Sequence, residues 1–356
     1  MQLLFQSELY EGEPEPQIIE YKTQQNKLFP SLARIFAFQF TAKSLSEAYY
    51  FTKESIDEIQ QGYESNDNGN VKEDLEKADF ALAELHVLSC GLKALITQEV
   101  ADSIDTLRRA CGGLGFMSCS NLPRLFGLAT AACTYEGENT VLLLQVSSNN
   151  LIISLEMLDV ILMLIEFEDL NINFSILMLK PCLIQVARYL VKSFRQIKSG
   201  TFNVAESIQY LSTLNKEQRK PFELHSAQNI VNQFRHVAYG QIEEAVSMLD
   251  RWILKGHRAE DAWNNTSVEL ISASLAHLRY FVMEGNADNL LNGVNSISKP
   301  LKNILLELFE MLAFTWMQQN FGDFLRHSGL QVMFFGVSIM FYSRAFSVYF
   351  RSRHIN

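Results

Sequence analysis

The stretch VKEDLEKADFALAELHVLSCGLKALITQEVADSIDTLRRACGG (71–113) decides the fold class. Its apolar residues recur every three or four positions, which is the period of one face of an α-helix. This stripe comprises Leu75, Ala78, Leu82, Leu85, Leu88, Leu92 and Ile96. The paired glycines Gly112 and Gly113 then end the helix or let another backbone approach closely. The stretch therefore predicts one long amphipathic helix.

The helical period continues on both sides of this stretch. Toward the N-terminus, residues 24–62 predict a helix, and the polar run 65–70 predicts a loop. Toward the C-terminus, helices are predicted over 223–259, over 264–283 and from Pro300 onward. The apolar residues aligned in the second of these are Val268, Ile271, Leu275 and Leu278. No strand alternation of useful length is present, so the sequence predicts an all-α protein with long antiparallel helices in two bundles.

Composition limits the possible functions. The 356 residues suffice for two helical domains, and the low count of 17 glycines and seven prolines favours long helices. The net charge of −10 argues against nucleic-acid binding. Because the five cysteines form no CxxC pair, neither a disulfide framework nor a metal site is expected. No signal peptide is expected either, since the N-terminus lacks a basic region.

Two segments, residues 146–185 and the tail 331–356, are unusually apolar. Acidic residues interrupt the first at short intervals: Glu156, Asp159 and Glu166. Arg344 interrupts the second. Because a charge near the bilayer centre costs roughly 2.5–3.5 kcal/mol, no stable membrane span is expected. A membrane-associated helical protein that uses both segments is the alternative interpretation.

Two short motifs carry residues suited to chemistry, RRACGGLGF (108–116) and CTYEGENT (133–140). In the first, a helix end turns through glycines, where a cofactor phosphate could approach the backbone. In the second, Glu136 lies at the start of an apolar helix, within an aromatic segment. Burial there would raise its pKa and make it a better proton acceptor near neutrality. The alternative is that Glu136 is an N-terminal charge that stabilises the helix dipole.

The sequences ACGGLGF (110–116) and CTYEGENTVLLLQ (133–145) resemble motifs of the acyl-CoA oxidases, in the acyl-CoA dehydrogenase superfamily. Ordered further matches reach residue 330: EPQIIEYKTQQNKLFPSLARIFAFQF (15–40), ELHVLSCGLKA (84–94), MSCSNLP (117–123), VARYLVKSFRQIKSG (186–200), DAWNNTSVELISASLAH (261–277) and QNFGDFL (319–325). The resemblance implies two helical units. One is a four-helix bundle of the acyl-CoA dehydrogenase C-terminal type, and the other is the C-terminal helical domain of the oxidases.

The resemblance also implies a reaction: FAD-dependent oxidation of a fatty acyl-CoA to trans-2-enoyl-CoA in peroxisomal β-oxidation, with molecular oxygen reduced to hydrogen peroxide. Glu136 matches the family's base, which removes the α-proton of the thioester. The residues that match the family's FAD-binding positions are Gly112, Gly113, Gln24, Gln25, Glu138 and Asn139. Because the superfamily binds FAD across a dimer interface, a homodimer is implied.

The chain also departs from the family's pattern. The family's N-terminal helical domain and β-domain, which supply much of the pocket, precede the segment that matches at residue 15. Leu114 stands where the family usually has histidine. Residues 146–185 interrupt a sequence that would otherwise join Gln145 to Val186. We interpret them as an insertion, from a retained in-frame intron or a gene-model error.

The expected organisation has four parts. An extended lead-in (1–17) precedes a helical bundle with the FAD and base motifs (18–200), a C-terminal helical domain (201–330) and an atypical apolar tail (331–356). The resemblance implies a peroxisomal location, although the tail ends in no peroxisomal signal. The alternative is an inactive, truncated helical fragment, then cytosolic, that pairs with full-length subunits.

Overall fold

The computed structural model describes residues 17–64, 71–144, 186–200, 205–214, 223, 226–293 and 298–330. Its elements over these residues are helices, with no strand among them, which confirms the all-α prediction. The predicted loop 65–70, the predicted insertion 146–185 and the tail 331–356 lie outside the described residues. So does all of the predicted lead-in except Gln17.

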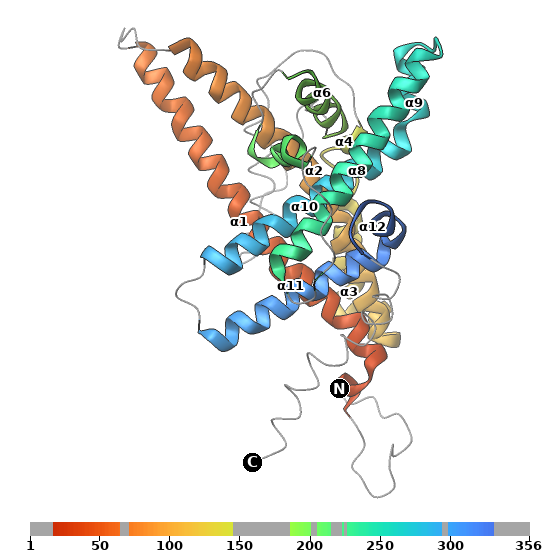
Figure 1. The fold of residues 1–356 in the computed structure, drawn as a ribbon. Helices are drawn as coiled ribbons and strands as arrows, with labels where there is room; N and C mark the ends of the chain where they lie inside the picture. Colours follow the sequence, from red (N-terminus) through yellow and green to blue (C-terminus); the bar gives the residue numbers. More distant parts are fainter. Residues whose placement is uncertain are drawn as a thin grey trace, which may run out of the picture.

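A long antiparallel hairpin forms the N-terminal half. After a single 3₁₀ turn, η1 (Ile18–Glu20), helix α1 (Lys22–Glu64) runs through Pro30, and α2 (Val71–Ala110) returns beside it (Figure 1). Two short 3₁₀ helices then turn the chain, η2 (Gly112–Phe116) and η3 (Ser118–Ser120). Helix α3 (Leu122–Ala132) packs back along α2, and α4 (Asn139–Leu144) follows it.

The remaining helices complete the fold. They are α6 (Val186–Ser199), η4 (Glu206–Ile208), α7 (Tyr210–Thr213), α8 (Ala227–Leu254), α9 (Ala259–Asn265), α10 (Ser267–Asp288), its π-helical extension η6 (Asn289–Gly293), α11 (Lys299–Gln319) and α12 (Phe321–His327). Pro300 lies in the first turn of α11, as predicted. The predicted helix 264–283 is wrong at its start. Thr266 is non-helical and separates α9 from α10, so Val268, predicted to align with the inner residues, is 70% exposed in the first turn of α10.

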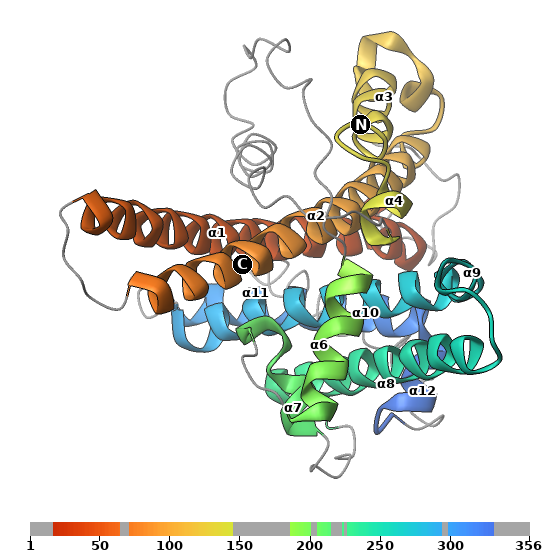
Figure 2. The same cartoon turned by 90° about the horizontal axis from the view of Figure 1, so that it is seen from above.

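One apolar core connects the N-terminal hairpin to the later helices. Helix α10 packs against both α8 and α1, and Figure 2 shows the hairpin lying across α10 and α11. Trp316 of α11 is fully buried between the rings of Phe38 on α1 and Phe234 on α8, with ring centroids 6.5 and 6.2 Å away. Its indole Nε1 donates to Glu99 Oε1 at 3.0 Å, and Glu99 also pairs with Arg34 of α1. This buried junction fixes the hairpin on the helices below it.

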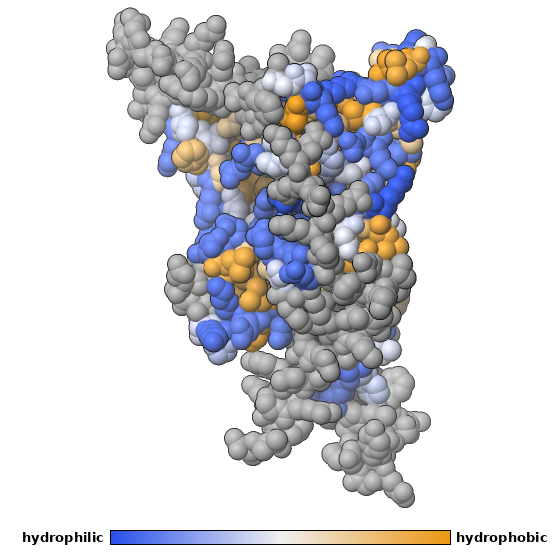
Figure 3. Space-filling view, viewed as in Figure 1, coloured by the Kyte–Doolittle hydropathy of each residue, from blue (hydrophilic) through white to orange (hydrophobic). Residues whose placement is uncertain are grey.

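On the face shown in Figure 3, the coloured residues are mainly hydrophilic (blue), with separate hydrophobic patches (orange). One patch lies at the upper right, at the end where α8 leads into α9 and where Leu254 is exposed. Within the described part of the chain, no helix combines the length and apolarity needed to cross a membrane.

Candidate functional site

The turn between α3 and α4, residues 133–139, carries the predicted base and is called the base turn below. Two successive residues have positive φ, Glu136 at 61° and Gly137 at 109°. Asn139 N–H donates to the carbonyl of Cys133 at 3.1 Å and closes the turn. A non-glycine residue with positive φ is uncommon and persists where its surroundings over-determine it. Gly137 is required here, because an added Cβ would lie 2.8 Å from Leu142 Cδ2.

Helix α2 holds the base turn from the other side. Lys93 Nζ donates to the carbonyl oxygen of Gly137 at 2.7 Å and to Asn139 Oδ1 at 3.0 Å. Asn139 Nδ2 donates to Thr97 Oγ1 at 3.0 Å, and Thr97 Oγ1 in turn donates to the carbonyl of Lys93 at 2.8 Å. Lys93, Thr97 and Asn139 are all buried. Each buried polar group therefore has a partner, as a stable polar network requires.

The electrostatics of the base turn separate its two glutamates. Burial raises the pKa of Glu136 above its ordinary value, although the Lys93 charge acts in the opposite direction. Exposed Glu138 accepts from the backbone N–H of Val141 at 3.1 Å and from Thr140 Oγ1 at 3.1 Å. Burial acts to raise the pKa of Glu138, but these hydrogen bonds outweigh it and lower that pKa. Glu138, rather than Glu136, is thus the charge that caps the N-terminus of α4.

The second predicted motif forms η2 at the end of α2, called the glycine turn below. Gly112 has φ of 60°, and no atom lies within 4 Å of the position of an added Cβ at Gly112 or Gly113. An added Cβ at Gly115 would instead lie 1.9 Å from the carbonyl oxygen of Arg108, so only glycine fits there. The Arg108 guanidinium lies over the rings of Phe116 and Phe126, at 4.5 and 4.8 Å from their centroids. One side of the turn is therefore packed, and the other leaves the backbone open.

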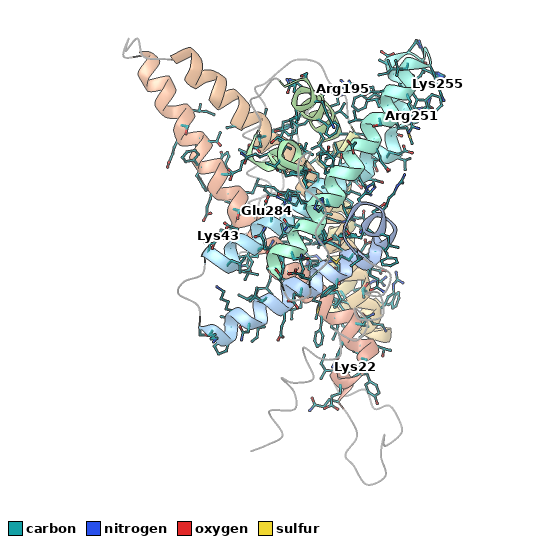
Figure 4. All side chains as sticks on the ribbon, in the orientation of Figure 1. Lys22, Lys43, Arg195, Arg251, Lys255 and Glu284 are labelled. Carbon is teal, nitrogen blue, oxygen red and sulfur yellow. The ribbon has the colours of Figure 1, made fainter. Side chains whose placement is uncertain are left out.

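The two predicted glutamines lie at the start of α1, near Lys22, which Figure 4 labels at the base of the molecule. Gln25 is buried; its Nε2 donates to the carbonyl of Ile19 at 2.9 Å, and its Oε1 accepts from Lys22 Nζ at 3.1 Å. Gln24 is half-buried. Because α1 and α2 are antiparallel and Arg34 pairs with Glu99, the start of α1 lies at the same end of the hairpin as the glycine turn.

The predicted site residues thus form two groups. Glu136, Glu138 and Asn139 lie beside the middle of α2, whereas Gly112, Gly113 and the two glutamines lie at its end. At about 1.5 Å per helical residue, Lys93 and the end of α2 are on the order of 25 Å apart. Among the described residues, no cluster of three or more His, Cys, Asp or Glu side chains is placed to hold a metal ion.

Sequence reasoning missed Lys93 and Thr97 as members of the site. Both lie on the predicted helix 71–113, and Lys93 is part of the quoted match ELHVLSCGLKA (84–94). The available signal was the position of Lys93 next to the apolar stripe of an amphipathic helix. Because lysine is rarely buried without a partner, a lysine at such a position indicates polar partners elsewhere in the fold. Its partners lie more than 40 positions away in the sequence, so spacing alone does not identify them.

Two family models match this chain: "Acyl-CoA oxidase, C-alpha1 domain" over residues 3–151 and "Acyl-CoA oxidase" over residues 226–335. The peroxisomal acyl-coenzyme A oxidase 1 of Pongo abelii is 32% identical over 332 residues, covering 91% of this chain and 41% of that protein. The chain thus spans about two fifths of the length of the curated relatives it matches.

Solved structures show the same similarity. Acyl-CoA oxidase-1 of Caenorhabditis elegans, complexed with FAD and ATP, superposes with a TM-score of 0.65 at 25% identity, covering 95% of this chain and 43% of that one. Acyl-CoA oxidase 1 of Arabidopsis thaliana superposes with a TM-score of 0.69 at 25% identity, with the same coverage. Both the sequence and the helical arrangement are therefore similar to one part of these larger proteins.

Proposed function

The chain belongs to the acyl-CoA oxidase family, and from this premise we propose that it contributes the catalytic base and part of the flavin site to an FAD-dependent oxidation of fatty acyl-CoA. The observation that carries the proposal is the base turn, which presents Glu136 in a left-handed conformation beside buried Lys93. The proposed product is trans-2-enoyl-CoA, and molecular oxygen is the proposed final electron acceptor.

Glu136 is proposed to remove the α-proton of the acyl thioester. Its carboxylate is half-buried, and burial raises its pKa, so it binds a proton more tightly than an ordinary glutamate. A base whose pKa lies closer to the operating pH is better matched to proton transfer. Lys93 limits this rise because its positive charge favours the ionised form, which must be present when the substrate arrives.

The glycine turn fits a role in holding the flavin dinucleotide. The open side of Gly112 and Gly113 leaves backbone N–H groups accessible, as close contact with a phosphate or ring edge requires. Half-buried Gln24 could contact the cofactor from the same end of the hairpin. Gln25 and Asn139 make internal hydrogen bonds and would act by shaping the site, while exposed Glu138 borders it. The bound flavin would supply the acceptor for the β-hydrogen.

A homodimer is proposed from the surface around the glycine turn. Phe116 and Met117 are exposed there, and α3 adds exposed Leu125 and Leu128. Figure 2 shows α3 standing out from the other helices. An exposed group of large apolar side chains is typical of a protein interface. A second copy that covers this face would bury these side chains and close the open side of the proposed flavin site.

A second candidate uses the same surface without catalysis. The chain could pair, through α3 and the glycine turn, with a full-length subunit of the family and contribute no complete pocket of its own. The observation that favours it is the open side of the glycine turn, which lies next to exposed apolar side chains and is left uncovered in a single chain. A peroxisomal location is proposed for the first candidate, from the peroxisomal relatives.

The two candidates are separated by one assay on the purified chain. Its visible absorbance reports bound flavin, and peroxide release is measured with a long-chain acyl-CoA. The first candidate predicts a yellow protein whose peroxide release falls about 10²- to 10⁴-fold in Glu136→Gln, the size expected for loss of a general base. Colourless, inactive protein that co-purifies with a co-expressed full-length oxidase would support the second. Unchanged peroxide release in Glu136→Gln would refute the role of Glu136.

A further inference from the structure

Lys93 is unusual among the lysines of the described chain because it lies inside the molecule. Its residue is 4% exposed, and it lies in the middle of α2 with one helical neighbour in the network, Thr97. Lysine is almost never fully buried unless it is paired. Burial lowers the pKa of Lys93, whereas the nearby acidic groups raise it. A desolvated cation kept in this place indicates a function beyond packing.

The contacts of Lys93 show which part of the molecule it controls. Its ammonium donates to the Gly137 carbonyl, the first backbone acceptor after Glu136, and to the Asn139 side chain two residues later. The bridge spans 44 residues of sequence and joins rigid α2 to the base turn. Glu136 itself holds φ of 61°, a conformation that an ordinary residue adopts at an energetic cost. The two hydrogen bonds from Lys93 add to the backbone bond between Asn139 N–H and the Cys133 carbonyl in restraining this turn.

We propose that Lys93 is a positioning residue for Glu136: it anchors the base turn through Gly137 and Asn139 and places one positive charge beside the carboxylate. The functional meaning of this role rests on Glu136 being the base, as proposed above. The structural and electrostatic parts do not depend on turnover. They can therefore be tested in the chain without flavin or substrate.

The charges around Glu136 define the expected electrostatic effect. Lys93 interacts with Glu136, Glu138, Cys133 and Cys90, and Glu136 also interacts with Tyr135. Lys93 is the cation that lowers the pKa of Glu136 against the effect of burial. Removing its charge while keeping the site buried should therefore raise the pKa of Glu136 further.

The test measures the pKa of Glu136 by carbon-13 NMR of its side-chain carboxyl, with the signal assigned by its loss in Glu136→Gln. Lys93→Met removes the charge and both hydrogen bonds and should raise this pKa. Lys93→Arg restores the charge and should return the pKa toward the wild-type value. Lys93→Gln keeps a donor without the charge, and should raise the pKa while preserving more of the wild-type Gly137 amide shift than Lys93→Met.

The matched control is Lys43→Met, since Lys43 is an exposed lysine on α1 (Figure 4).

Two outcomes would overturn the proposal. One is a folded Lys93→Met or Lys93→Gln protein with the Glu136 pKa of the Lys43→Met control. The other is an unchanged Gly137 amide shift in folded Lys93→Met. If Lys93→Met does not fold, the Glu136 pKa measured in Lys93→Gln and in Lys93→Arg tests the proposal instead. If the Glu136 pKa shifts in these variants but turnover does not depend on Glu136, the positioning role of Lys93 is supported and the function proposed for Glu136 is refuted. Failure of the one proposal can therefore be told from failure of the other.

Discussion

The base turn and the glycine turn meet the same helix, α2, yet they are held in opposite ways. In the base turn, Lys93 and Asn139 satisfy one another inside a buried network, and Glu136 is restrained within one chain. The glycine turn packs only one side, against Arg108, and leaves Gly112 and Gly113 open beside exposed α3. The difference indicates that this chain restrains the proposed base by itself, whereas the side proposed to hold the flavin is left open in a single chain.

A single methyl group added to a glycine of each turn should have different effects on stability. Gly137→Ala adds a Cβ 2.8 Å from buried Leu142 at a φ that side chains rarely adopt. Such strain costs on the order of 1–3 kcal/mol, and we expect the free energy of unfolding to fall by that amount. Gly113→Ala meets no atom within 4 Å and should change it by less than about 0.5 kcal/mol.

Urea denaturation followed by circular dichroism measures both variants. If Gly113→Ala destabilised the chain as much as Gly137→Ala does, the glycine turn would be packed on both sides, and the contrast between the turns would be lost. Flavin binding provides the complementary readout, because the added methyl group of Gly113→Ala faces the open side and should weaken binding of the dinucleotide.

A smaller effect on stability is expected at α3, where association should change instead. Leu125 and Leu128 are 42% and 45% exposed, so replacing both with lysine removes little buried surface. We expect an unfolding free energy within about 0.5 kcal/mol of the wild type. In the proposed dimer the same charges would be buried without partners, so sedimentation should show monomers at concentrations where the wild type is dimeric.

Leu254→Lys is the matched control for that experiment. Leu254 is also exposed, but it lies at the end of α8, away from the glycine turn. Sedimentation of this variant should match the wild type. Dissociation by Leu254→Lys, with none by the Leu125→Lys and Leu128→Lys pair, would place the interface elsewhere on the chain.

The helices were predictable because their signal is local. The stripe in residues 71–113 is periodic, and Leu85, Leu88 and Leu92 of that stripe are buried in α2. The exception is Val268, because the periodic pattern of the sequence continues across the interruption between α9 and α10. Thr266 is non-helical, and its hydroxyl donates to the carbonyl of Ala262 at 2.8 Å. A new helix starts after it, and Val268 in the first turn of that helix is exposed.

The candidate site was predictable only where its residues are adjacent in sequence. Glu136 and its neighbours were identified by their motif, but the assignment of capping to Glu138 depends on the path of the turn. Lys93 was not identified, because its role arises from folding two segments against each other. The same holds for the Arg34–Glu99–Trp316 junction, which joins three helices through side chains with no shared motif.

Joining Gln145 directly to Val186, which removes the predicted insertion 146–185, should leave the folded core and the base turn in place. Leu142 and Leu143 at the end of α4 and Val186 and Ala187 at the start of α6 are buried in the same core, and the two helices contact each other. The joined chain therefore already has both ends of the new connection in place. We expect an unfolding free energy within about 1 kcal/mol of the parent and an unchanged Glu136 pKa, because the described hydrogen bonds between the base turn and α2 are kept. A joined chain that fails to fold, or whose Glu136 titrates differently, would mean that residues 146–185 are an integral part of this protein and support the base turn.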